Sequence, residues 1–208
     1  MIEAVLADAL GAPVRNRRIL DIGCGNGGIS RHFARENDHY GVDVSDRRHE
    51  DARDFAFRLV DCERLPFADN SFDIVISHHV IEHVFDQKLH LSEIRRVLKP
   101  SGLAYLATPN KSSPIMEGHV GNDLVLRYHA MAPLFERQGF EAREYATEVL
   151  REPDRYDGEI RWGRFLPRFL LQLLRPLFPS HVFVLTLQAQ QEHTPSQTQE
   201  AGLLSHAN

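Results

Sequence analysis

The sequence predicts an α/β fold in which a mostly parallel sheet is covered by helices on both faces. Three observations lead to this prediction. Short apolar segments alternate with helix-like segments, a glycine-rich loop follows the first apolar segment, and an aspartate ends each of the next two. Alternating strands and helices form βαβ units, which build parallel sheets that bind ligands at the carboxyl ends of their strands.

The expected elements follow from apolar patterning and from turn residues. Strands are expected at 18–22, 40–44, 55–60, 72–77 and 103–107, and helices at 29–36 and 87–98. Lys-Pro-Ser-Gly at 99–102 is a typical turn that would end the second helix. Beyond residue 110 we expect a helix at 130–138 and strands at 141–147 and 181–188. Residues 45–54 are short for a helix between the second and third strands.

The length of 208 residues predicts one domain, over 1–189. Residues 149–180 would form an insert between the last two strands, and the polar segment 190–208 is expected to be a disordered tail. Hydrophobic residues make up 42% and charged residues 25% of the chain, which is typical of a globular protein. These proportions argue against a disulfide-dependent scaffold or a largely disordered chain.

Charge, cysteine content and the N-terminus narrow the class of protein further. A net charge of −5 argues against a nucleic-acid partner. Only two cysteines are present, the first residues lack a basic segment, and no apolar run is long enough to cross a membrane. We therefore expect a reducing, cytoplasmic location.

The loop Asp-Ile-Gly-Cys-Gly-Asn-Gly-Gly at 21–28 predicts a ligand-binding turn between a strand and a helix. Taken alone, it fits two templates. One is the dinucleotide fingerprint G-x-G-x-x-G, and the other is G-x-G-x-G preceded by an acid. Asp43 would accept hydrogen bonds from ribose hydroxyls in either case. Asp21 favours the second template, because a carboxylate before the glycines repels a pyrophosphate and attracts an ammonium or a sulfonium.

Six motifs in order make the chain resemble a class I S-adenosylmethionine-dependent methyltransferase of the small-molecule branch related to quinone biosynthesis. They are Ile-Leu-Asp-Ile-Gly-Cys-Gly-Asn-Gly at 19–27, Tyr-Gly-Val-Asp at 40–43, Asp-Cys-Glu-Arg-Leu-Pro-Phe at 61–67, the strand at 72–77, Val-Ile-Glu-His-Val at 80–84 and Glu-Ile-Arg-Arg-Val-Leu-Lys-Pro at 93–100. The resemblance implies a Rossmann-like sheet of seven strands, the last of which is antiparallel and inserted beside the strand at 141–147.

The resemblance also implies which residues contact S-adenosylmethionine. The methionine part would lie against Asp21, Gly23, Cys24 and Gly25, with Ser77 and His78 near its carboxyl end; the ribose would contact Asp43, and the adenine would contact Val44, Asp61 and Cys62. Ser101 stands where the family usually has a second glycine, which changes a turn and leaves the chemistry unaffected.

The pattern His79-Val-Ile-Glu82-His83 has three interpretations. It fits the H-x-x-E-H signature of some zinc peptidases, and on a helix His79 and His83 would share one face that could hold a metal. It also coincides with the family segment after the fourth strand, where some relatives place acidic residues and histidine around a divalent metal. The favoured interpretation is packing at the edge of the cofactor site, without a metal.

His119 and His129 are the candidate catalytic residues. They flank the segment after the fifth strand, where this family recognises its acceptor. A neutral imidazole could take the proton from a hydroxyl near neutral pH. The alternative is that both histidines are exposed or locally bonded.

Residues 160–191 contain four arginines and no acidic residue. A helix over 167–175 would place Arg168 and Arg175 on one face and phenylalanine and leucine on the other, which is typical of a segment that lies on a membrane surface. Alternatively, the helix covers the sheet edge and its arginines extend into solvent. The chain could therefore be peripheral to the inner face of the membrane, with contact through 160–180.

The functional hypothesis is methyl transfer from S-adenosylmethionine to a small or lipid-linked acceptor, more often at oxygen than at nitrogen or carbon. Two alternatives from other classes remain. The chain could be an NAD-dependent oxidoreductase, which Asp21 and Asp61 disfavour, or a non-catalytic protein that binds the cofactor or a membrane.

Overall fold

The computed structural model describes residues 1–110, 128–145, 165, 167–174 and 180–188. Most of the predicted insert and the predicted tail at 190–208 lie outside these residues. The elements are α1 (Ile2–Leu10), β1 (Arg18–Ile22), α2 (Gly28–Ala34), β2 (Asp38–Asp43), the 3₁₀ turn η1 (Glu50–Ala52), β3 (Ala56–Leu59), β4 (Phe72–His78), α3 (Gln87–Val97), β5 (Leu98–Pro109), α4 (Tyr128–Arg137), β6 (Phe140–Glu144), α7 (Arg168–Leu174) and β7 (Ser180–Leu187).

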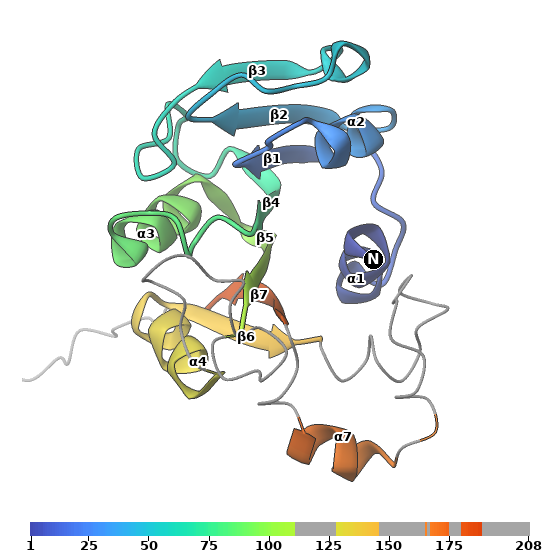
Figure 1. Cartoon of the computed structure of the whole chain (residues 1–208), viewed down its shortest axis with the longest axis vertical. Helices are drawn as coiled ribbons and strands as arrows, with labels where there is room; N and C mark the ends of the chain where they lie inside the picture. The colour runs from blue at the N-terminus through green and yellow to red at the C-terminus, as the bar shows by residue number, and fades with distance from the viewer. Residues whose placement is uncertain (111–127, 146–164, 166, 175–179, 189–208) are drawn as a thin grey trace, which may run out of the picture.

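The described strands form one seven-stranded sheet in the order β3-β2-β1-β4-β5-β7-β6 (Figure 1). Neighbouring strands from β3 to β5 pair in parallel. The last strand, β7, is antiparallel to both β5 and β6, between which it lies. The predicted fold class, including the antiparallel insertion of the last strand, is confirmed.

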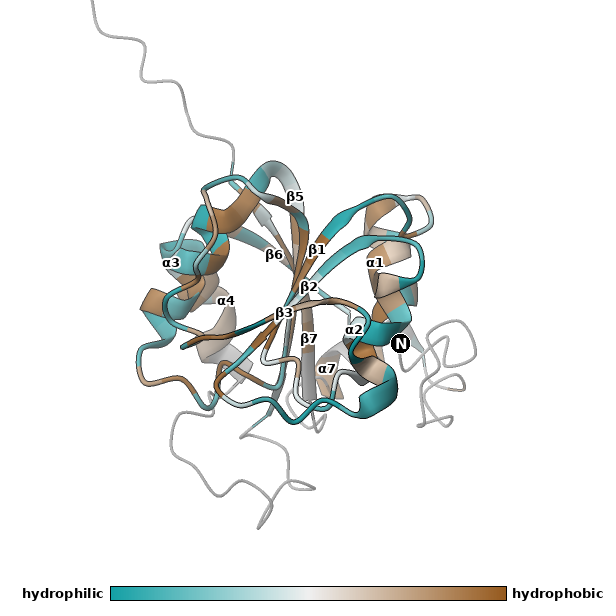
Figure 2. Cartoon of the chain, turned by 90° about the horizontal axis from the view of Figure 1, so that it is seen from above, coloured by the Kyte–Doolittle hydropathy of each residue, from teal (hydrophilic) through white to brown (hydrophobic). Residues whose placement is uncertain are grey.

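Helices cover both faces of the sheet (Figure 2). On one face, apolar side chains of α3 and α4 such as Ile94 and Phe135 share a buried core with Leu20 and Ile22 of β1. On the other face, α1 and α2 bury Val5, Leu6 and Phe33 against Ile19. Because side chains alternate along a strand, β1 contributes to both cores, which is why its sequence is almost continuously apolar.

The fifth strand begins earlier than the sequence predicts. The expected turn at 99–102 is part of β5, and the pairing with β4 moves from Phe72↔Leu98 to Ile74↔Leu103 within two residues of β4. The extra residues form an irregularity of the β-bulge kind. A side chain at Gly102 would come within 2.7 Å of Leu98, so glycine allows this close return of the chain.

One element near the N-terminus differs from the prediction. Helix α1 was not predicted. It ends at Gly11, whose φ of 65° is left-handed, and Asp8 accepts hydrogen bonds from Tyr145 (3.1 Å) and Arg143 (3.4 Å) of the last part of the sheet. The short segment 45–54 contains only η1, as its length led us to expect.

His39 in β2 is a buried aromatic side chain that packs between two phenylalanine rings. Its ring stacks on the ring of Phe33, with 6.4 Å between the ring centroids, and meets the ring of Phe55 edge-on, with 5.6 Å between centroids. Within the described part of the chain, neither ring nitrogen has a hydrogen-bond partner. Burial lowers the pKa of His39 to about 4.

Replacing His39 with phenylalanine should stabilise the protein most under acidic conditions. In the unfolded chain His39 becomes protonated as pH falls below 6.5. In the folded chain the same side chain stays neutral down to about pH 4. The wild type should therefore lose up to about 3 kcal/mol of unfolding free energy across this range. Urea unfolding at about pH 4.5 and about pH 7.5 measures the difference. An equal effect of His39→Phe at both pH values would contradict this explanation.

Candidate functional site

The candidate site lies where the carboxyl ends of β1, β2 and β4 meet. The register pairs Ile22 of β1 with Val42 of β2 and with Ser77 of β4, so the three strands end side by side. The glycine loop leaves β1 at this edge and leads into α2. This is the edge at which the sequence placed the ligand.

The glycine loop has a backbone conformation that requires glycine. Gly23, Gly25 and Gly27 have φ angles of 68°, 53° and 82°, which are left-handed. The amides of Gly23 and Cys24 both donate to the carbonyl of Val42, at 2.8 and 3.0 Å. A Cβ at Gly23 would lie 2.5 Å from Cγ2 of Val80, so the loop packs directly against the segment after β4.

Asp43 connects the end of β2 to the glycine loop. Its Oδ2 accepts from the Gly25 amide at 2.9 Å and its Oδ1 accepts from the Ser45 amide at 3.0 Å. The residue is 3% exposed, whereas the next residue, Val44, is 69% exposed. A carboxylate has about four acceptor positions, so Asp43 keeps capacity for further hydrogen bonds.

Asp21 is a buried carboxyl group directly behind the loop. It is 1% exposed, and its Oδ2 accepts from the Ser30 hydroxyl at 2.6 Å. Burial raises the pKa of Asp21 to about 7, against the lowering effect of the Ser30 hydrogen bond, and the nearby Asp43 carboxylate raises it further. A cation brought close to Asp21 would favour its ionised form.

The loop after β3 carries Asp61 and Cys62. Asp61 is exposed, and its Oδ1 accepts from the Glu63 amide at 2.9 Å. Cys62 is buried, and its carbonyl accepts from Nδ1 of His90 in α3 at 2.9 Å. Burial raises the pKa of the Cys62 thiol to about 11 and that of Cys24 to about 12, so both are neutral, apolar side chains of the site.

His90 is a site residue that the sequence analysis missed. It is fully buried, and burial holds its pKa below the usual range. Since Nδ1–H donates to Cys62, the neutral ring accepts at Nε2 from the Ser77 hydroxyl, at 3.1 Å. His90 thereby joins β4 to the loop after β3. The only sequence signal is a histidine on the apolar face of a helix.

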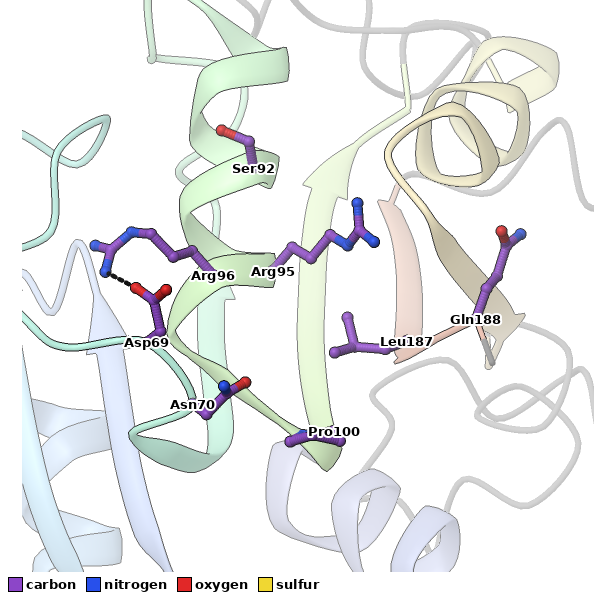
Figure 3. Close-up of a pocket in the computed structure, with 8 residues that line it drawn as sticks. All are labelled: Asp69, Asn70, Ser92, Arg95, Arg96, Pro100, Leu187 and Gln188. Atoms are coloured by element: carbon purple, nitrogen blue, oxygen red, sulfur yellow. Dashed lines mark hydrogen bonds and ion pairs between the residues drawn. The ribbon is translucent and has the colours of Figure 1, made fainter. Parts of the chain in front are cut away.

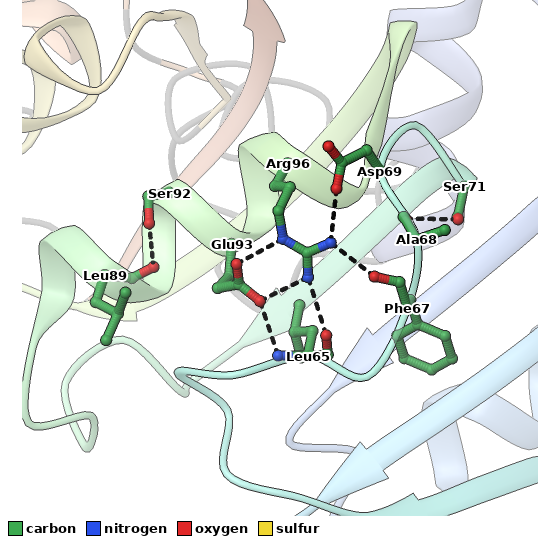
Figure 4. Close-up of polar contacts among 9 residues, drawn as sticks. All are labelled: Leu65, Phe67, Ala68, Asp69, Ser71, Leu89, Ser92, Glu93 and Arg96. Carbon is green, nitrogen blue, oxygen red and sulfur yellow. Dashed lines mark hydrogen bonds and ion pairs between the residues drawn. The ribbon is translucent and has the colours of Figure 1, made fainter.

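Arg96 holds the rest of this loop against α3 (Figure 4). Its guanidinium forms a bidentate pair with Glu93, with both distances 2.7 Å, and contacts Asp69 at 2.9 Å. It also donates to the carbonyls of Leu65 (2.9 Å) and Phe67 (2.6 Å). Charge-assisted bonds of this kind are stronger than neutral ones, so the loop is fixed relative to α3.

The segment His79–His83 is not a helix, so the shared metal-binding face considered for His79 and His83 does not form. His79 has a left-handed φ of 56°, and its Nδ1 lies 3.1 Å from Oε1 of Glu82. His83 is exposed. Among the residues that the structure describes, no three His, Cys, Asp or Glu side chains are grouped to hold a metal.

The two histidines predicted as bases cannot be placed in the site. His119 lies outside the described residues. His129 belongs to the first turn of α4, and its side chain also lies outside the description. Their role stays a prediction.

A hollow of about 700 Å³ lies between α3 and the end of β7 (Figure 3). It is lined by Asp69, Asn70, Ser92, Arg95, Arg96, Pro100, Leu187 and Gln188. These residues surround the start of β4 and β5, and therefore the opposite edge of the sheet from the glycine loop. The hollow is not part of the candidate site.

Comparison with known proteins agrees with this geometry. Residues 20–106 match the model of a methyltransferase domain. This segment of the chain is therefore similar to a methyltransferase domain. The matched residues include the glycine loop, Asp43, the loop after β3 and His90, so the domain match and the geometric site coincide.

The curated relatives are similar to part of the chain. A ubiquinone biosynthesis O-methyltransferase of Sinorhizobium fredii is 37% identical over 109 residues, which cover 48% of this chain and 44% of the relative. One from Cereibacter sphaeroides is 34% identical over 126 residues, covering 56% and 51%. The chain thus spans about half the length of the curated relatives it matches.

Solved structures share the fold of this chain. A TehB-like S-adenosylmethionine-dependent methyltransferase of Corynebacterium glutamicum has a TM-score of 0.60 at 20% identity, over 89% of this chain and 87% of that one. A phosphoethanolamine N-methyltransferase 2 of Haemonchus contortus has a TM-score of 0.63 at 22% identity, over 91% and 52%.

The residues of the candidate site fit a cationic, nucleoside-containing cofactor. The glycine loop leaves backbone accessible where side chains would exclude a ligand, and Val44 presents an uncovered apolar surface beside Asp43. Asp21 supplies a desolvated carboxyl group behind the loop. A pyrophosphate would meet negative charge at this position, whereas an amino acid ammonium or a sulfonium would be stabilised.

Replacing Asp21 with asparagine should remove a pH dependence from the stability of the apo protein. Between about pH 4 and about pH 7 the folded state keeps a proton on Asp21 that the unfolded state has lost. The wild type should therefore become less stable relative to Asp21→Asn as pH rises, by roughly 4 kcal/mol at most. Urea unfolding of both proteins across this range gives the difference in unfolding free energy. The contribution of His39 cancels in this difference, because both proteins contain His39. Parallel curves would show that Asp21 ionises normally.

Proposed function

We propose that the chain is a methyltransferase that transfers the methyl group of S-adenosylmethionine to an oxygen of a small or lipid-linked acceptor. The observation that carries this proposal is the coincidence of the domain match with a glycine loop held by Val42 and Asp43 and backed by a buried carboxyl group, Asp21. Oxygen is preferred as the acceptor atom because the curated relatives are named O-methyltransferases.

In this proposal the residues of the site bind and orient the cofactor. Gly23, Cys24 and Gly25 take the methionine part, with Asp21 opposite its ammonium. Asp43 accepts hydrogen bonds from the ribose hydroxyls. Val44, Asp61 and Cys62 take the adenine, and Ser77 and His78 lie toward the methionine carboxyl end.

S-adenosylmethionine supplies a methyl group that is already activated by the positive sulfur. The protein therefore contributes mainly by positioning the acceptor in line with the departing sulfur and by excluding water. The bonds of His90 serve this purpose, because they join the loop after β3 to Ser77 of β4.

Calorimetric titration with S-adenosylhomocysteine tests the cofactor site. Wild type should bind, with NAD⁺ as a negative control, and Asp43→Ala should weaken binding about 10- to 100-fold, because it removes a charged acceptor. Asp43→Asn keeps an oxygen for the Gly25 amide and separates loss of charge from loss of loop structure. Asp38→Ala, at the opposite end of the same strand, is the matched control. Absence of binding by wild type would refute the proposal.

A lipid-linked acceptor is supported by an uncovered apolar stripe near α7. Phe165, Phe169 and Leu173 are spaced four residues apart and are 82%, 71% and 73% exposed, while Leu171 is fully buried and holds the helix to the protein. The surrounding sequence 160–191 contains arginines and no acidic residue. In the described part of the chain no helix is long and apolar enough to cross a membrane. We therefore propose contact with the surface of an anionic membrane.

Cosedimentation with lipid vesicles tests this contact. Wild type should pellet with vesicles that contain anionic lipid and less with neutral vesicles, because each arginine near an anionic surface contributes about 1 kcal/mol. Phe169→Ser with Leu173→Ser should remain in the supernatant. Leu59→Ser is the control, since Leu59 is 63% exposed on β3, at the other end of the sheet. Equal recovery of all proteins in the supernatant at low salt would show that the stripe has another role.

A further inference from the structure

We infer that His79 is the general base that takes the proton of a hydroxyl acceptor, and that Glu82 and Thr108 are positioning residues for its ring. This inference rests on the proposed function and replaces His119 and His129 as the first candidates for the base. It depends on three observations: the contacts of the His79 ring, the place of His79 beside the glycine loop, and its backbone conformation.

The His79 ring is oriented by a buried carboxylate. Nδ1 lies 3.1 Å from Oε1 of Glu82, and Oε2 of Glu82 accepts from the Thr108 hydroxyl at 3.1 Å. Glu82 is 4% exposed, whereas the His79 side chain is 40% exposed. Although burial acts to raise it, the pKa of Glu82 is lowered by the hydrogen bonds from His79 and Thr108. An ionised Glu82 accepts from Nδ1–H and leaves Nε2 as the basic atom.

His79 stands at the edge where the cofactor is expected. It directly follows β4, and its amide donates to the Ala107 carbonyl of β5 at 2.9 Å. The next residue, Val80, packs against Gly23, so the segment that carries His79 touches the glycine loop. A group bound to that loop and an acceptor bound beside β4 and β5 would therefore meet near the imidazole.

The backbone of His79 is in the left-handed region, which residues other than glycine rarely adopt. Its left-handed φ of 56° costs conformational energy in a residue that has a Cβ. A glycine would remove this cost and also the imidazole. Strain of this kind persists where the surrounding structure determines it, and here the strained residue carries the ring that contacts Glu82.

The groups that face His79 would stabilise the charged ring that forms during the reaction. His78 meets it edge-on at 4.5 Å, and burial lowers the pKa of His78 to about 4, so His78 is uncharged near neutral pH. Glu82 supplies the negative charge, and Thr108 supplies an uncharged hydroxyl. The imidazolium that forms would be stabilised by the Glu82 carboxylate, as in other histidine–carboxylate pairs.

The proposed step is balanced. The acceptor oxygen forms a bond to the methyl carbon as its O–H proton moves to Nε2 of His79, and the electron pair of the carbon–sulfur bond stays on sulfur, giving neutral S-adenosylhomocysteine. The proton later leaves His79 to solvent. No metal, oxidant or further reactant is needed.

The test compares His79→Gln and Glu82→Gln with His83→Gln, a control that changes an exposed histidine of the same loop. The probe acceptor is 3,4-dihydroxybenzoate. His79→Gln should lower turnover about 10²- to 10⁴-fold and remove the acidic limb of the pH–rate profile, while binding of S-adenosylhomocysteine stays unchanged. Glu82→Gln should give a smaller fall, and His83→Gln should resemble wild type.

A second readout does not depend on the acceptor. Long-range proton–nitrogen NMR spectra should show His79 of wild type protonated at Nδ1, and Glu82→Gln should lose this tautomer preference. The inference is overturned if His79 is protonated at Nε2, if His79→Gln turns over normally, or if only His119→Gln or His129→Gln is impaired. Retained binding of S-adenosylhomocysteine in any of these cases keeps the cofactor site and refutes the base alone.

Discussion

The structure depends on one close approach, that of the glycine loop to the ends of β2 and β4. Two loop amides share the Val42 carbonyl, a third donates to Asp43, and Gly23 has no space for a Cβ because Val80 lies against it. These contacts come from the end of β2 and from the segment after β4, so the parallel register of β1, β2 and β4 must be correct before the loop can form. The site and the sheet are therefore specified together.

The same edge holds polar groups whose burial is costly unless they are paired. Asp21 is paired with Ser30, His90 with Ser77 and the Cys62 carbonyl, and Glu82 with His79 and Thr108. In each pair the partner fixes the orientation of the buried group. His39, which has no such partner in the described part of the chain, stacks between aromatic rings and acts as an apolar side chain. Burial alone thus does not mark a functional histidine, whereas burial with directed partners does.

Local signals explain what could be predicted from the sequence. Strand β1, the glycine loop and the ends of α3 are encoded by contiguous residues, and their predicted positions agree with the structure within one or two residues. Helix α1 and the early start of β5 were missed because they depend on contacts with distant strands. His90 was missed for the same reason, since its partners lie 13 and 28 residues away in the chain. A polar residue on an otherwise amphipathic helix gives no sign of such partners.

The two edges of the sheet differ in how many of their hydrogen-bonding groups are already bound to other protein groups. At the opposite edge, Arg96 binds two carboxylates and two carbonyls, so its donors are consumed in holding a loop. At the carboxyl edge, Glu82 uses both oxygens to orient His79, and Nε2 of His79 has no hydrogen-bond partner among the described residues. Asp43 likewise keeps acceptor capacity, and Val44 keeps an uncovered apolar surface. A side chain is suited to bind a ligand when some of its polar atoms are bound to the protein and others are still available. Its orientation is then fixed before the ligand arrives.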